Sequence, residues 1–129
     1  GRRQGINFSS DGYKLFITNS ATDASDPEAS RNLIREYSLD SPFNISNPTN
    51  NGDFQPSYIA KFRLTGLTFN NDGSKMYVVG SLSNADRIVE YNLTTNYYTS
   101  TSSNTKYIER TENIVTIIFL GKPHFFFKS

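Results

Sequence analysis

The stretch "GLTFNNDGSKMYVVGS", residues 66–81, repeats an earlier stretch, "GINFSSDGYKLFITNS", residues 5–20. Aligned without gaps, the two stretches are identical at 6 of 16 positions, and six more pairs are conservative. Self-similarity of this kind predicts that the chain builds the same structural unit twice.

A second block also occurs twice. "IREYSL", residues 34–39, returns as "IVEYNL", residues 88–93. The spacing between these two copies is shorter than that of the first block, which places an insertion in the first copy, within "ATDASDPEASR", residues 21–31. A weaker echo joins "YIAK", from Tyr58, to "YIER", from Tyr107. Each copy therefore carries the same blocks in the same order.

Each block has the pattern of β-strands. The first block holds two apolar runs joined by "SSDG" or "NNDG". Asp-Gly between apolar runs is a strong hairpin signal, because glycine accepts a positive φ and aspartate caps the turn. The "EYSL" and "EYNL" strands alternate between two faces, and the blocks from Tyr58 and Tyr107 are expected to form outer strands. Four strands per copy predict one antiparallel sheet each, as in a β-propeller or another β-repeat array.

The repeated turn carries a family resemblance. "FSSDGYKLFITN", residues 8–19, and "FNNDGSKMYVV", residues 69–79, resemble the "F-S-P-D-G-K-x-L-Y-V-T-N" signature of the YVTN and TolB-like bacterial β-propeller repeats. The "V-x-x-Y-x-L" of that family is matched by the second block, so the resemblance covers about residues 5–98. The usual proline before the aspartate is Ser10 or Asn71 here. The resemblance implies propeller blades and a bacterial setting outside the cytoplasm or at the cell surface.

The sequence thus predicts an all-β chain with two four-stranded blades of an incomplete β-propeller. Residues 1–62 form the first blade with the inserted loop 21–31, residues 63–112 the second, and residues 113–129 an off-pattern apolar tail. A closed propeller has roughly four to eight blades. We expect a fragment of a longer propeller; a tail out of register with its gene and a ring completed by two to four copies are the alternatives.

Composition excludes several classes of function. The 129 residues normally form one domain. With 13 basic and 12 acidic residues, the net charge of +1 gives no electrostatic case for a nucleic-acid partner. The chain has no cysteine, which excludes disulfides and thiolate metal sites. No segment approaches the roughly 18 apolar residues of a membrane span, and no cofactor-binding motif is present.

Repetition separates structural residues from functional candidates, because a residue present in both copies is expected to serve the fold. This filter assigns a structural turn to both Asp-Gly pairs in preference to catalysis or metal binding. The turn residues are Asp11, Gly12, Asp72 and Gly73. Lys14 and Lys75 follow these turns, and we expect them to be solvated or paired with aspartate.

Two further kinds of side chain recur. Glu36 and Glu90 share a strand face with an isoleucine, so each is expected to be partly buried with a partner. A hydrogen bond to the neighbouring blade, or simple exposure at a sheet edge, is favoured over one arm of a polar ring near a channel. Tyr97 and Tyr98 have the chemistry to stack on a sugar, but Phe43 occupies the position equivalent to Tyr97, which favours packing between blades.

The insertion 21–31 is the candidate ligand-binding loop, because it is unique to one copy and loops carry function more often than strands. It contains Asp23, Asp26 and Glu28. Their oxygens suit Ca²⁺, but their spacing is not that of a calcium loop, so a solvated loop is expected and no metal site is predicted. His124 is the only histidine and does not make a catalytic triad or a zinc site by itself.

These observations predict a non-enzymatic β-propeller module that binds protein or carbohydrate. Its other expected partners are the remaining blades or further copies of the chain. Two alternatives stay open. One is a fragment of a propeller enzyme of lactonase or quinone-dependent dehydrogenase type, with its catalytic residues in missing blades. The other is a self-assembling structural protein, suggested by the open sheet edges.

Overall fold

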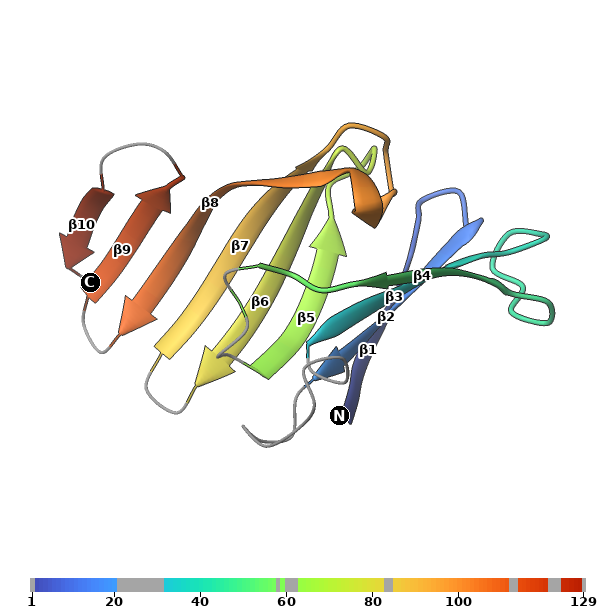
Figure 1. Ribbon diagram of the computed structural model, residues 1–129, viewed down its shortest axis with the longest axis horizontal. Coiled ribbons are helices and arrows are strands. Elements are labelled where there is room, and N and C mark those ends of the chain that lie inside the picture. Colours follow the sequence, from blue (N-terminus) through green and yellow to red (C-terminus); the bar gives the residue numbers. More distant parts are fainter. Residues whose placement is uncertain are drawn as a thin grey trace.

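Two antiparallel sheets make up the computed structural model, which describes residues 2–20, 32–57, 59, 63–82, 85–111, 114–120 and 124–128 (Figure 1). The first sheet contains β1 (Arg2–Phe8), β2 (Lys14–Ser20), β3 (Leu33–Ser38) and β4 (Thr49–Phe54), in that order. The second contains β5 (Arg63–Phe69), β6 (Lys75–Leu82), β7 (Ala85–Leu93), β8 (Ser102–Thr111), β9 (Ile114–Phe119) and β10 (His124–Lys128), with the 3₁₀ turn η2 (Thr99–Thr101) before β8. The all-β prediction is confirmed. Within the described residues, no helix has the length and hydropathy that a membrane crossing requires.

The duplication extends to irregularities of the backbone. Each sheet has a register shift between its first two strands, just before the equivalent glycines Gly5 and Gly66. Each has another between its third and fourth strands, just after the equivalent glutamates Glu36 and Glu90. A bulge re-aims a strand and tightens its twist, so the two sheets share a shape as well as a strand order.

An aromatic ring packs on each Asp-Gly turn. Gly12 and Gly73 have φ values of 79° and 75°, which favour glycine. Phe43 and Tyr97, at equivalent positions of the two copies, also have positive φ values, and their amides donate to the carbonyls of Gly12 and Gly73 at 2.8 and 2.9 Å. A Cβ on either glycine would overlap the ring of its partner. The glycines are therefore required by both backbone conformation and close packing.

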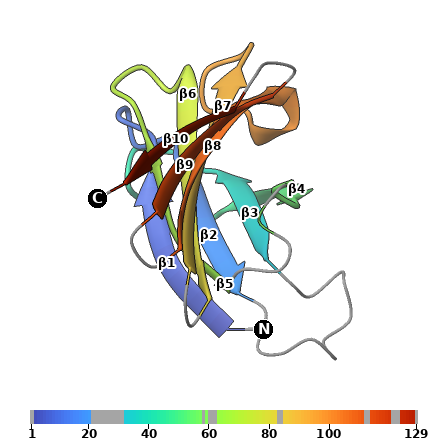
Figure 2. The same cartoon turned by 90° about the vertical axis from the view of Figure 1, so that its left-hand side faces the viewer.

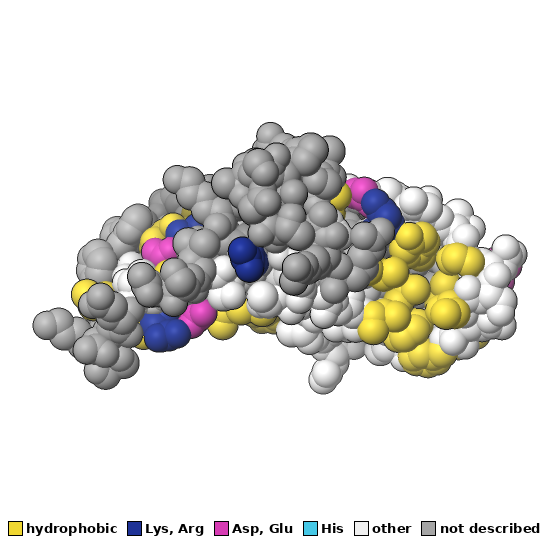
Figure 3. All heavy atoms as spheres, turned by 90° about the horizontal axis from the view of Figure 1, so that it is seen from below, with side chains coloured by type: hydrophobic (Ala, Val, Ile, Leu, Met, Phe, Trp, Pro, Cys, Tyr) yellow, Lys and Arg dark blue, Asp and Glu magenta, His cyan; other side chains and the backbone are white. Residues whose placement is uncertain are grey.

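The core lies between the two sheets, which stack one behind the other along the long axis of the molecule (Figure 2). The first sheet contributes Phe16 and Ile34, both fully buried. The second contributes Leu64, Met76, Val78, Val89, Tyr91 and Leu93. The rings of Phe16 and Phe69 lie 4.6 Å apart, and those of Phe54 and Tyr91 lie 5.7 Å apart. On the side of the first sheet that faces away from this core, hydrophobic side chains gather at the surface (Figure 3).

The second sheet has six strands, where the sequence predicted four. Residues 113–129 were expected to be an off-pattern tail, but β9 pairs with β8 and β10 pairs with β9, both antiparallel. Only two residues separate β8 from β9. So short a connection keeps a strand beside its predecessor as a hairpin. The apolar run "IVTIIF" therefore continues the existing sheet and does not begin a new one.

The outer strand of the first sheet lies earlier in the chain than predicted. The sequence placed it from Tyr58, but β4 pairs with β3 so that Phe54 lies opposite Ile34. Residues 58 and 60–62 lie outside the described residues, and Ile59 is buried in the core outside any strand. The β4 sequence, "TNNGDF", is exposed along five of its six residues. A solvated edge strand held by backbone pairing has no apolar pattern to reveal it.

Candidate functional site

The loop that the sequence singled out, residues 21–31, lies outside the described residues, and Asp23, Asp26 and Glu28 all belong to it. Among the residues that are described, no group of three or more His, Cys, Asp and Glu side chains could hold a metal ion. The site therefore has to be sought among the groups that the two sheets bring together.

The repeated aspartates are used inside their turns. The Tyr13 amide donates to Asp11 Oδ1 at 3.0 Å, and the Ser9 hydroxyl donates to the same oxygen at 2.7 Å. The Ser74 amide donates to Asp72 Oδ1 at 2.9 Å. The Tyr13 amide, with the Ser9 hydroxyl, lowers the pKa of Asp11, and Ser74 lowers the pKa of Asp72. Both carboxylates are thus held ionised as acceptors for their own turns.

Lys14 forms a buried ion pair at the junction of the two sheets. Its ammonium lies 2.8 Å from Glu36 Oε2, donates to the Tyr97 carbonyl at 3.2 Å, and lies 3.0 Å from the centre of the Tyr98 ring. The expectation that Lys14 is solvated or paired with aspartate was wrong. Strand alternation puts Lys14 on the same face as Phe16, which the second sheet covers, so its charge needs a partner there.

Glu36 ties the first sheet to the second. Its Oε1 accepts hydrogen bonds from the Thr99 amide at 3.1 Å and the Thr99 hydroxyl at 3.0 Å, and Asn51 donates to Oε2 at 3.0 Å. Burial disfavours the charged carboxylate, but the hydrogen bonds from Lys14, Thr99 and Asn51 outweigh it and lower the pKa of Glu36. The predicted hydrogen bond to the neighbouring repeat is confirmed.

The equivalent pair in the second sheet is only partly exposed, because the Glu90 side chain is 12% exposed. Lys75 lies 3.4 Å from Glu90, and 41% of its side chain is exposed. Glu90 also accepts a hydrogen bond from Thr105 at 2.7 Å and lies 3.6 Å from Lys106. Burial acts against its charge, but Thr105 and the two lysines outweigh it and lower the pKa of Glu90. The same sequence pair thus occupies two environments, one covered by the other sheet and one in which the lysine is exposed.

A pocket of about 380 Å³ opens beside the buried pair, where the first Asp-Gly turn meets the loop after β7. It is lined by Ser9, Asp11, Tyr13, Lys14, Ser38, Leu39, Asn96, Tyr97 and Tyr98. Two of these, Tyr13 and Tyr98, are 46% and 45% exposed. Their repeat equivalents are Ser74 and Asn44, so each tyrosine is unique to one copy.

Tyr97, in contrast, belongs to the scaffold. Its ring lies 5.1 Å from that of Phe69, and its hydroxyl contacts Ser10 Oγ at 3.2 Å and donates to the Asn71 carbonyl at 3.1 Å. It therefore joins the two turns across the sheets, as the packing interpretation predicted. Its equivalent, Phe43, is 58% exposed.

The sequence contains two unrepeated tyrosines that point to the pocket, but it does not show that they lie close together. Tyr13 follows one repeated turn and Tyr98 follows one repeated aromatic, and neither is repeated itself. Tyr13 belongs to the first copy and Tyr98 to the second. Only the packing of the two sheets against each other brings both tyrosines to one pocket.

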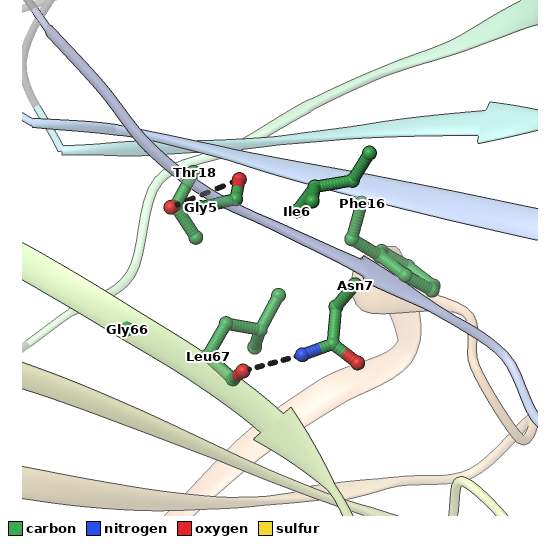
Figure 4. A pocket seen from close by; sticks show the side chains of 7 residues that line it. All are labelled: Gly5, Ile6, Asn7, Phe16, Thr18, Gly66 and Leu67. Atoms are coloured by element: carbon green, nitrogen blue, oxygen red, sulfur yellow. Dashed lines mark hydrogen bonds between the residues drawn. The ribbon is translucent and has the colours of Figure 1, made fainter.

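A smaller pocket lies between β1 and β5 (Figure 4). It is lined by Gly5, Ile6, Asn7, Phe16, Thr18, Gly66 and Leu67. Asn7 donates to the Leu67 carbonyl at 2.7 Å, and Thr18 donates to the Gly5 carbonyl at 3.4 Å. Its volume of about 100 Å³ matches a few water molecules at roughly 30 Å³ each. We interpret it as a packing gap where two strands from different sheets meet.

No family model, curated protein or solved structure matches the chain. The resemblance to YVTN and TolB-like repeats stays a prediction.

Proposed function

We propose that the chain comprises two consecutive β-propeller-type repeats and acts as a non-enzymatic binding module outside the cytoplasm or at the cell surface. The duplicated sheets, each a meander in chain order, support the repeat interpretation. Their face-to-face packing around one core supports it further, because each repeat covers a face that the other leaves open. The ligand site in this proposal is the pocket between the first Asp-Gly turn and the loop after β7.

The observation that carries the proposal is the pairing of Tyr13 and Tyr98 in that pocket. These two tyrosines are half-exposed and unique to one copy each, and the Lys14 ammonium contacts the Tyr98 ring from the buried side. Large exposed aromatics in a concave site are typical of binding rather than of packing. The volume of about 380 Å³ falls within the range of small-molecule sites.

The chemistry of the pocket favours a neutral sugar. Tyrosine rings offer flat apolar faces, while Asp11, Ser38 and Asn96 offer polar groups around them. The charge of Lys14 is balanced by Glu36, so the pocket does not select an anion. Both charged side chains in the lining are engaged in structural contacts, Asp11 in its turn and Lys14 in its ion pair. That arrangement suits recognition better than proton transfer, which needs a group free to exchange its proton with a substrate.

The test is titration calorimetry with a panel of neutral oligosaccharides, such as gluco-, manno- and N-acetylchito-hexaoses. We expect one of them to bind, and Tyr13→Ala and Tyr98→Ala each to weaken binding at least about tenfold, or about 1.4 kcal/mol. Tyr98→Phe keeps the ring and should bind nearly as the wild type does. Tyr77→Ala, on the opposite face of the second sheet, is the control. Absence of binding across the panel, or binding indifferent to both tyrosines, would exclude the site.

A further inference from the structure

The face of the second sheet that is turned away from the first sheet, which we call the far face, carries a row of apolar side chains between the Asp86–Arg110 and Lys75–Glu90 ion pairs. Val79, Ile88, Ile108 and Ile117 are successive cross-strand partners, so they form one row across four strands of this face. Ile88 is 42% exposed and Ile108 is 39% exposed. A row of branched apolar side chains across four strands is the kind of surface that sheets bury.

The far face is the repeat equivalent of a face that is covered within this chain. Ile88 corresponds to Ile34, and Tyr77 corresponds to Phe16. Ile34 and Phe16 are fully buried, because the second sheet packs against them. The chain therefore shows directly what such a face binds, namely the back of the next repeat.

The first sheet has the complementary open surface, which we call the outer face. It carries Ile6, Phe8, Ile17, Tyr37 and Phe43, and Figure 3 shows hydrophobic side chains gathered over this end of the molecule. Ile6 and Phe43 are 60% and 58% exposed. The equivalents in the second sheet are Leu67, Phe69, Val78, Tyr91 and Tyr97, all members of the core or packed against it.

The polar contacts of the internal interface also have equivalents on the two open faces. Lys75 and Glu90 on the far face correspond to Lys14 and Glu36, and both pairs are formed. Lys14 donates to the Tyr97 carbonyl, and the equivalent acceptor is the carbonyl of Phe43. Phe43 has a φ of 58°, close to the 61° of Tyr97, so its carbonyl is presented in the same way.

We propose that the far face of one copy binds the outer face of a second copy, repeating the sheet-on-sheet packing seen within the chain. The contact is heterologous, because two different surfaces meet, and copies add head to tail to form a ring or an open chain. The inference rests on the internal interface and is independent of the ligand pocket.

This contact is expected to be weaker than the internal one. The outer face carries the Arg35–Asp53 ion pair, with 2.7 Å between its nearest atoms, where the second sheet has Val89 and Tyr107. Desolvating an ion pair opposes the gain from apolar burial. We therefore expect association that reverses on dilution.

Light scattering of the full chain over a wide concentration range tests the contact. We expect the average mass to rise with concentration, and Ile88→Glu and Ile6→Glu each to weaken association at least about tenfold. Ile114→Glu is the matched control, because Ile114 is 43% exposed and lies on the opposite face of the second sheet from Ile88. Circular dichroism checks that each variant keeps its fold.

Mixing the two variants separates head-to-tail contact from every other kind. Ile88→Glu retains a sound outer face and Ile6→Glu a sound far face, so an equimolar mixture should form a one-to-one dimer that does not grow. A wild-type chain that stays monomeric at every concentration would overturn the proposal. So would a mixture that remains monomeric, or association that only Ile114→Glu disrupts.

Discussion

At the scale of the residue, the two Lys–Glu pairs show how context decides what a repeated sequence does. Lys14 and Glu36 are covered by the second sheet, and Glu36 accepts four hydrogen bonds from three residues. Lys75 and Glu90 occupy the equivalent positions of the second copy, but no second sheet covers them, and 41% of the Lys75 side chain is exposed. A buried pair that loses one partner leaves a charge without compensation, whereas an exposed pair contributes little.

Glu36→Gln should lower the free energy of unfolding by about 2 kcal/mol at pH 7, as expected for loss of a hydrogen-bonded charge. The pKa of Glu36 is lower in the folded chain than its ordinary value of 4.5. The unfolded state therefore binds the proton more readily, and the contribution of Glu36 is complete above that value and disappears as the pH falls through the folded pKa. Urea unfolding measured between pH 7 and pH 3 should show the difference between variant and wild type shrinking towards zero.

The comparison between variant and wild type is needed because other carboxyl groups also have lowered pKa values. These are Asp11, Asp53, Asp72 and Glu90. The stabilisation that these ionised carboxylates provide is lost at low pH in both proteins equally, so it cancels in the difference between their free energies of unfolding. Glu90→Gln is the matched control, and its effect should be smaller at pH 7. If the free energy of unfolding of Glu36→Gln stays below that of the wild type by the same amount at every pH, this account is wrong.

At the scale of the element, local chemistry predicted the hairpins well. The Asp-Gly turns at Gly12 and Gly73 determine where β2 and β6 begin, because only glycine accepts the positive φ and the close aromatic ring. The strands with apolar patterns were also predicted. The polar strand β4 was missed because backbone pairing and polar side-chain contacts hold it, and neither leaves an apolar pattern. The burial of Lys14 was missed because it depends on which face the other sheet covers.

The two equivalent isoleucines of β3 and β7 give a matched prediction. Ile34→Ala should cost about 2–5 kcal/mol, because its site is fully buried and a cavity remains. Ile88→Ala should cost less than about 1 kcal/mol in dilute solution, where its side chain is 42% exposed. Urea unfolding at low protein concentration measures both. Equal costs would contradict the description of the Ile34 face as covered and the Ile88 face as open.

At the scale of the whole molecule, the core belongs to neither sheet alone. Phe16 and Ile34 come from the first sheet, whereas Val78 and Val89 come from the second. Hydrogen bonds also cross between the two halves, including one from the Tyr91 hydroxyl to the Ser57 carbonyl at 2.7 Å. A four-stranded sheet with one apolar face cannot bury that face by itself. The two sheets are therefore expected to fold and unfold as one unit.

Amide hydrogen exchange of an Ile34→Val variant tests that cooperativity. The substitution should cost about 0.5–1.5 kcal/mol. If the sheets unfold together, the slowest-exchanging amides of β6 and β7 lose the same free energy of protection as those of β2 and β3, although the change lies only in the first sheet. Ile114→Val, at an exposed position of β9, is the control and should leave protection unchanged in both sheets. Loss of protection confined to β2 and β3 would mean that each sheet is stable alone, and that the shared core couples them weakly.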